Sequence, residues 1–92
     1  AMAIDPGNPN TFCECAVMQM QSLKQPHKAL SNLKHALELD PDHAESHARL
    51  CSLYITALND LSLAKFHYEK AVTLDEHYKD TLTEQIFTEA GV

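Results

Sequence analysis

Residues 29–43 read ALSNLKHALELDPDH, and residues 64–78, which lie 35 positions further on, read AKFHYEKAVTLDEHY. The segments align without a gap, and the matching pairs are Ala29 and Ala64, Leu33 and Tyr68, Ala36 and Ala71, Leu37 and Val72, Leu39 and Leu74, and Asp40 and Asp75. Residues seven apart lie near one face of an α-helix, so the paired alanines let another helix approach closely. A repeat of this length predicts a helix-turn-helix unit that buries its apolar face only by stacking on a neighbour.

The composition of the chain indicates one small packed domain. Its 92 residues are 45% hydrophobic, which is too apolar for a disordered tail. The net charge of −6 argues against nucleic acid as the main partner, because nucleic-acid-binding proteins gather Lys and Arg against phosphates. No apolar run approaches the roughly 18 residues of a membrane span, so we expect a soluble chain with no membrane insertion. We expect residues 10–92 to form the domain and residues 1–9 to be an expression-vector remnant or a disordered leader.

Three cysteines bear on the cellular compartment. Cys13, Cys15 and Cys51 are odd in number and irregularly spaced, which is unlike a disulfide framework. Free thiols indicate a reducing compartment, so we expect a cytoplasmic protein. On a helix, Cys13 and Cys15 would point about 200° apart, and they would not chelate a metal jointly.

Only two glycines and four prolines interrupt the chain, so the pattern predicts about five helices joined by short turns. The expected starts are Thr11 with a Thr11-x-x-Glu14 capping box, Pro26, Asp42 with an Asp42-x-x-Glu45 capping box, Asn59 or Asp60, and Glu76. The second helix should end near Asp40, before Pro41, and the fifth near Ala90.

Apolar residues at helical spacings of three and four identify the faces that should point inward. They are Cys13, Ala16, Val17 and Met20 in the first helix, Ala29, Leu30, Leu33, Ala36 and Leu37 in the second, Leu50, Leu53, Tyr54 and Ala57 in the third, Leu61, Ala64, Tyr68, Ala71 and Val72 in the fourth, and Leu82 and Ile86 in the fifth.

These positions resemble the tetratricopeptide repeat, whose second helix follows the pattern A-x3-F-x2-A and precedes a proline. The matching residues are Ala29, Leu33, Ala36 and Pro41 in one unit and Ala64, Tyr68 and Ala71 in the next, where Glu76 replaces the proline. The resemblance covers about residues 10–90. It implies an all-α fold, a right-handed superhelical stack of antiparallel helix pairs, with two repeats followed by a terminal capping helix.

In such arrays the first helices of the units line a concave groove that holds extended or helical peptides. The resemblance therefore implies a non-catalytic interaction module, an adaptor or scaffold, that binds another protein or a peptide segment without a cofactor. The residues expected in this groove are Met18, Arg49, Ser52, Ile55 and Phe87. Met18, Ile55 and Phe87 are apolar on a face that should be wet, so we expect them to anchor the partner and to contribute little to the core. Arg49 should pair with an acidic or polar group of the partner.

One subgroup of the family grips the C-terminal carboxylate of heat-shock chaperones with a basic clamp. The corresponding places here hold Glu14, Met18, Arg49, Asp80 and Glu84. Three of these five residues are acidic, so a carboxylate would be repelled and this function does not carry over.

Two alternatives belong to other classes. The chain could be a structural or self-association segment of a longer repeat protein, held through exposed apolar residues. It could also be a metal-responsive module, since His43 and His47 lie four apart on one expected helix. The sequence places no third ligand, and no Glu follows His43 as in H-E-x-x-H. No local motif joins a nucleophile to a base, so we expect no enzyme.

Overall fold

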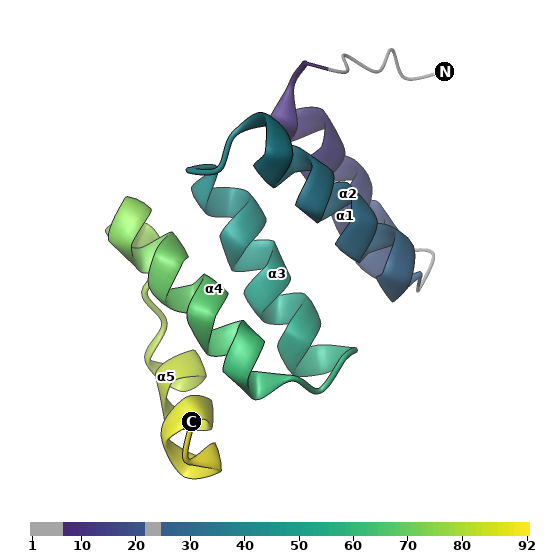
Figure 1. The fold of residues 1–92 in the computed structure, drawn as a ribbon. Helices are drawn as coiled ribbons and strands as arrows, with labels where there is room; N and C mark the ends of the chain where they lie inside the picture. Colours follow the sequence, from purple (N-terminus) through teal and green to yellow (C-terminus); the bar gives the residue numbers. More distant parts are fainter. Residues whose placement is uncertain (1–6, 22–24) are drawn as a thin grey trace.

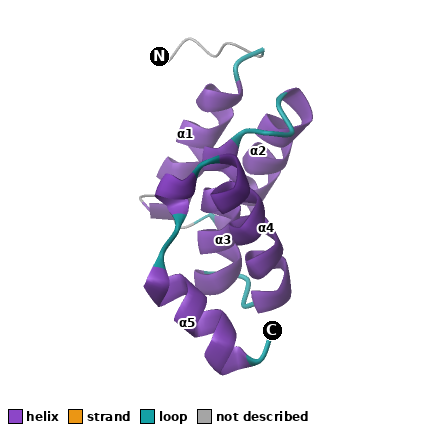
Figure 2. Ribbon diagram, turned by 90° about the vertical axis from the view of Figure 1, so that its left-hand side faces the viewer, coloured by secondary structure: helices purple, strands orange, loops and turns teal. Residues whose placement is uncertain are grey.

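The computed structural model describes residues 7–21 and 25–92, and these residues form five α-helices and no strand. The helices are α1 (Pro9–Gln21), α2 (Pro26–Leu39), α3 (Ala44–Thr56), α4 (Leu61–Leu74) and α5 (Thr81–Ala90), with a 3-10 turn, η1 (Glu76–Tyr78), before α5. Figure 1 shows α1 beside α2 and α3 beside α4 as two helix pairs. Figure 2 shows α5 following at the far end of the stack. The expected all-α stack of helix pairs is confirmed.

The two halves of the sequence repeat become equivalent helices. α2 and α4 each span 14 residues, and each ends at an aspartate in extended conformation. The N–H of Asp40 donates to the carbonyl oxygen of Ala36 at 2.9 Å, and the N–H of Asp75 donates to that of Ala71 at 2.8 Å. The Oδ1 atom of each aspartate then accepts the N–H two residues later, at 3.1 Å and 3.0 Å. The same side-chain turn therefore redirects the chain after both helices.

Most residues that the helical spacing assigns to the interior are buried. The buried apolar residues are Cys13, Ala16, Ala29, Leu33, Ala36, Leu50, Cys51, Leu53, Tyr54, Ala64, Tyr68, Ala71 and Phe87. The alanines are fully buried, as close helix contacts require. Ala57 is an exception, since it is the exposed C-cap of α3, where the chain turns away towards α4.

Three expected helix starts are wrong, those of the first, third and fifth helices, because other side chains make the caps. α1 begins at Pro9, before Thr11, and Oδ1 of Asn8 accepts the N–H of Asn10 at 2.9 Å. The cap of α3 is His43 rather than Asp42. The cap of α4 is Asp60, as expected. Residues 1–6 of the expected leader lie outside the described residues, whereas Pro9 already belongs to α1.

The expected inward face of the fifth helix is also wrong. α5 begins at Thr81, because Asp80 caps it and η1 occupies residues 76–78. Leu82 is 71% exposed and Ile86 is 39% exposed, whereas Phe87 is only 3% exposed. The ring of Phe87 packs on that of Tyr68 from α4, with their centroids 5.6 Å apart. This contact sets which side of α5 faces the stack.

None of the helices in the described ranges has both the length and the apolarity that a membrane crossing needs.

Candidate functional site

A cleft of about 330 Å³ opens between α3, α4 and α5. Its lining residues are Ala48, Cys51, Ser52, Ile55, Thr56, Tyr68, Ala71, Tyr78, Asp80, Thr83 and Ile86. Buried residues, Cys51 and Ala71 among them, form its floor, and exposed Ser52 and Ile86 lie at its rim. The cleft is therefore an apolar hollow with hydroxyl groups around it. Its volume lies at the small end of the range for ligand pockets.

Tyr68, on α4, lines the cleft on the side that faces α5. Its hydroxyl accepts the N–H of Asp80 at 2.9 Å and donates to the carbonyl oxygen of the same residue at 3.3 Å. Oδ1 of Asp80 accepts the N–H of Leu82 at 3.0 Å, and Oδ2 accepts the hydroxyl of Thr83 at 3.0 Å. One buried hydroxyl on α4 therefore holds the segment that begins α5.

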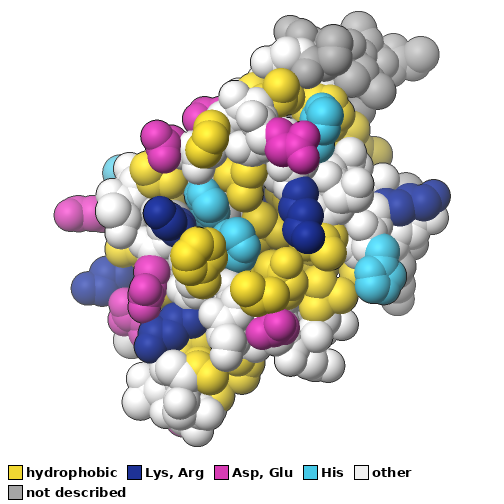
Figure 3. Space-filling view, viewed as in Figure 1, with side chains coloured by type: hydrophobic (Ala, Val, Ile, Leu, Met, Phe, Trp, Pro, Cys, Tyr) yellow, Lys and Arg dark blue, Asp and Glu magenta, His cyan; other side chains and the backbone are white. Residues whose placement is uncertain are grey.

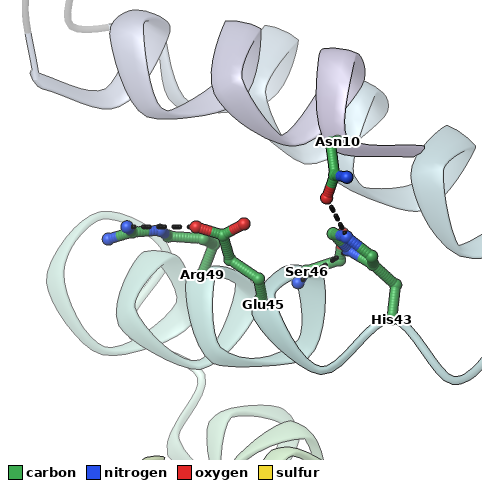
Figure 4. A network of polar contacts seen from close by, with 5 residues as sticks. All are labelled: Asn10, His43, Glu45, Ser46 and Arg49. Atoms are coloured by element: carbon green, nitrogen blue, oxygen red, sulfur yellow. Dashed lines mark hydrogen bonds and ion pairs between the residues drawn. The ribbon is translucent and has the colours of Figure 1, made fainter. Parts of the chain in front are cut away.

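Glu45 and Arg49 lie on α3 and face α1, as Figure 4 shows. Nη2 of Arg49 is 3.6 Å from Oε1 of Glu45, a loose ion pair, and Nε of Arg49 is buried with no hydrogen-bond acceptor among the described residues. Burial raises the pKa of Tyr78, the charges of Glu45 and Asp75 raise it further, and Arg49 lowers it. Arg49 precedes Ser52 of the cleft lining by three residues, so the two side chains lie on neighbouring positions of one face of α3.

The structure brings together only part of the groove expected from the sequence. Ser52 and Ile55 line the cleft, whereas Arg49, one helical turn before Ser52 on α3, is not among the lining residues. Met18 is 52% exposed on α1 and is not among the lining residues. The expectation that Phe87 is a surface anchor outside the core is wrong, because its ring is buried against Tyr68.

Sequence reasoning missed several lining residues, which are Ala48, Cys51, Tyr68, Ala71, Tyr78 and Ile86. The repeat itself contained a signal for one of them. Tyr78 stands 35 positions after His43, so the two residues are equivalent in the repeat. His43 contacts Asn10 of α1, the first helix of the first unit, and this contact indicates that Tyr78 lies near α3, the first helix of the second unit. Ile86 was assigned to the interior, and it lines the cleft because Phe87 takes the inward position.

His43 connects α1 to α3, as Figure 4 shows. Its Nδ1 accepts the N–H of Ser46 at 3.3 Å and lies 2.6 Å from the hydroxyl oxygen of the same residue. The ring proton therefore sits on Nε2, which donates to Oδ1 of Asn10 at 2.6 Å. His43 is thus both a helix cap and a bridge between helices.

His47 faces His67 of α4 rather than His43. The two Nδ1 atoms are 2.9 Å apart, and Nε2 of His47 lies 3.0 Å from the carbonyl oxygen of Pro41. A carbonyl only accepts, so His47 carries its proton on Nε2 and His67 donates from Nδ1. Burial, then the charges of His47 and Lys34, lower the pKa of His67 to about 4. His67 is therefore neutral at pH 7.

His43 and His47, the two residues proposed for a metal site, thus have different hydrogen-bond partners. Within the described part of the chain, no group of three or more His, Cys, Asp or Glu side chains is arranged to hold a metal ion. Figure 3 shows histidine side chains in the middle of one face of the molecule, beside hydrophobic side chains and Lys or Arg.

The buried thiols are protonated at neutral pH. Burial, followed by the charge of Glu45, raises the pKa of Cys13 to about 11. Burial, followed by the charge of Asp80, raises the pKa of Cys51 to about 11 as well. Cys15 is half-buried on another side of α1, as the spacing predicts. Since the thiolate is the reactive form, neither buried cysteine is set up as a nucleophile.

A sequence model of the tetratricopeptide repeat matches residues 21–43 and 44–78, so it covers more than half of the chain. Comparison with curated proteins and with solved structures found no match. The matched segments contain α2, α3, α4 and the 3-10 turn before α5, and α3, α4 and this turn supply most of the cleft lining. Repeats of this type generally mediate protein–protein interactions and are typically non-catalytic. The boundary between the two matches falls at the start of α3, where the second helix pair begins, and the chain belongs to the tetratricopeptide repeat family.

Proposed function

We propose that the chain is a non-catalytic adaptor that binds a peptide or helix of another protein in the cleft between α3, α4 and α5. The observation that carries this proposal is the cleft itself, an apolar hollow of about 330 Å³ with exposed hydroxyl and aliphatic side chains at its rim. A small number of apolar anchors, seated in such a pocket, supplies most of the affinity of a typical interface. The three free cysteines support a cytoplasmic setting.

Individual residues have distinct roles in this proposal. Ile55 and Ile86 contact the apolar anchor of the partner, and Ser52 offers a hydroxyl to its backbone. Arg49 donates to an acidic or polar group through the outer end of its guanidinium, since its side chain is 40% exposed. A partner longer than the cleft would reach α1, which packs beside α3 and exposes Met18.

The test uses a phage-displayed library of random 12-residue peptides, selected on the intact chain. We expect enriched clones to lose binding to Ser52→Arg, because an arginine at this exposed position fills the cleft. Ser31→Arg is the matched control, an exposed serine on α2 outside the cleft. Melting temperatures of both variants should equal that of the wild type. Equal binding of the clones to both variants would place the partner on another surface.

Self-association is the second candidate, and one observation favours it. Leu63, Phe66 and Leu74 are exposed at spacings that share one face of α4. A second copy of the chain would cover this face. Light scattering separates the two candidates, because a self-associating chain gains mass as its concentration rises and an adaptor does not.

A further inference from the structure

One carboxylate of the cleft lining keeps a negative charge that no neighbour neutralises. Asp80 is exposed, and its side-chain oxygens accept only from neutral donors, the N–H of Leu82 and the hydroxyl of Thr83. Among the described residues, no ion pair involves Asp80. The same side chain therefore caps α5 and presents a charge to anything that enters the cleft.

Neither Arg49 nor Lys79 neutralises the charge of Asp80. The charge of Arg49 is offset by Glu45 on the same helix. Lys79 precedes Asp80, but residues 79 and 80 are both extended. Successive side chains on an extended backbone point to opposite sides. Tyr78 and Asp80 therefore share the cleft side, whereas Lys79 is exposed and not part of the lining.

Three titratable groups that line the cleft have pKa values raised by burial and by nearby carboxylates, and Asp80 is one of these carboxylates for two of them. The charge of Asp80 adds to burial in raising the pKa of Cys51. After burial, the charges of Glu84 and Asp80 are among the causes that raise the pKa of Tyr68. Glu45 and Asp75 act in the same way on Tyr78.

We propose that the cleft selects a segment that carries Lys or Arg directly beside its apolar anchor, and this refinement rests on the proposed function of the same cleft. The aliphatic stem of such a side chain packs along Ile55 and Ile86 while its charged end pairs with Asp80. Arg49, already beside Glu45, takes a neutral carbonyl oxygen of the partner rather than a carboxylate. Charge complementarity of this kind sets the specificity of an interface more than its total affinity.

The test begins with the composition of the selected 12-residue clones. We expect Lys and Arg to outnumber Asp and Glu. In synthetic copies, changing the basic residue to Glu should weaken binding more than tenfold, because attraction becomes repulsion. Asp80→Asn should weaken binding of the unchanged peptide about fivefold, as expected for one partly exposed charge pair. Asn remains a good helix cap, so α5 should still form. Asp80→Ser, another capping residue without charge, repeats the measurement if Asp80→Asn folds poorly.

The control separates a local charge from the general attraction of a chain with net charge −6. Asp42→Asn removes an exposed carboxylate from the turn before α3, away from the cleft lining. Equal loss of affinity in Asp42→Asn and Asp80→Asn would overturn the inference. Enrichment of acidic clones that still lose binding to Ser52→Arg would also overturn it, while leaving the proposed function intact. Clones that bind Ser52→Arg as tightly as the wild type would overturn both the inference and the proposed function.

Discussion

The rings of Tyr68 on α4 and Phe87 on α5 lie with their centroids 5.6 Å apart and their planes inclined by 59°. Both side chains are at least 93% buried, since their exposed fractions are 7% and 3%. The hydroxyl of Tyr68 also bonds both backbone groups of Asp80. One side chain therefore fixes the start of α5 through its hydroxyl and the rotation of α5 through its ring, so it determines the shape of the cleft.

Phe87→Ala should destabilise the fold, whereas Ile86→Ala should not. Removing a buried phenylalanine ring leaves a cavity and costs about 3 kcal/mol. Ile86 is 39% exposed, so its truncation should cost about 1 kcal/mol or less. Urea unfolding followed by circular dichroism measures both variants. Similar midpoints for the two would show that the rotation of α5 is assigned incorrectly.

Tyr68→Phe should loosen α5 while leaving the rest of the stack intact. The change keeps the ring contact with Phe87 and removes the hydroxyl that bonds Asp80, at a cost of about 1 kcal/mol. Amide hydrogen exchange of residues 81–90 should accelerate. Exchange in α1, which lies in the other helix pair, serves as the internal control and should be unchanged. A uniform acceleration through the whole chain would contradict a local role for the hydroxyl.

Much of the fold was predictable because repeated small residues report directly on helix packing. Ala36 and Ala71 are both fully buried at equivalent positions of α2 and α4, so the repeat marks the stack. Pro26 at the start of α2 and Asp60 before α4 act within one turn of their own position. These two signals held, whereas the capping boxes at Thr11 and Asp42 did not, since α1 begins earlier and His43 caps α3.

The predictions that were wrong concern features that depend on contacts between residues far apart in the sequence. Phe87 and Ile86 are neighbours in one helix, and only the position of Tyr68 decides which of them is buried. His43 caps α3 in place of Asp42, and its ring is also held by Asn10 from α1. The cleft lining likewise combines three helices, so helical spacing within one of them identified Ser52 and Ile55 but not Tyr78.

Ala36→Asp and Ala71→Asp should each unfold a large fraction of the protein. Both positions are fully buried, and an unpaired carboxylate there costs several kcal/mol, about as much as the stability of a small domain. Ala57→Asp is the control, because Ala57 is exposed at the end of α3. Equal melting temperatures of Ala36→Asp and Ala57→Asp would be incompatible with the packing described.

Zinc or nickel should not raise the melting temperature. A specific site would stabilise the folded chain by mass action, but His43 bonds Ser46 and Asn10 while His47 faces His67. Thermal melts with and without metal measure this. A rise that disappears in the His43→Ala, His47→Ala double variant would support the metal alternative. A rise that disappears in His67→Gln and persists in His43→Ala would locate a site at the His47–His67 pair.

Acidification from pH 6.5 to pH 4 should destabilise the protein through His67. The ordinary histidine pKa is 6.5, and in the fold burial, His47 and Lys34 lower the pKa of His67 to about 4. Between these values the unfolded chain binds a proton that the folded chain does not, so stability falls as pH falls and is independent of this group above pH 6.5. We expect a loss of about 1 kcal/mol, discounted for the half-buried ring.

Urea unfolding at intervals from pH 7.5 to pH 4.5 measures this loss. The other groups around the ring are His47 from α3, Lys34 from α2 and the stacked Tyr54. His67→Gln keeps a polar side chain without a titrating ring, so its stability should depend less on pH in this window. His77 is the matched control, since its ring is exposed and bonds Asp75 at 2.8 Å, and Asp75 has a lowered pKa that matters only below its ordinary value of 3.8. If His67→Gln and His77→Gln flatten the profile equally, the contact between His47 and His67 does not control the acid response.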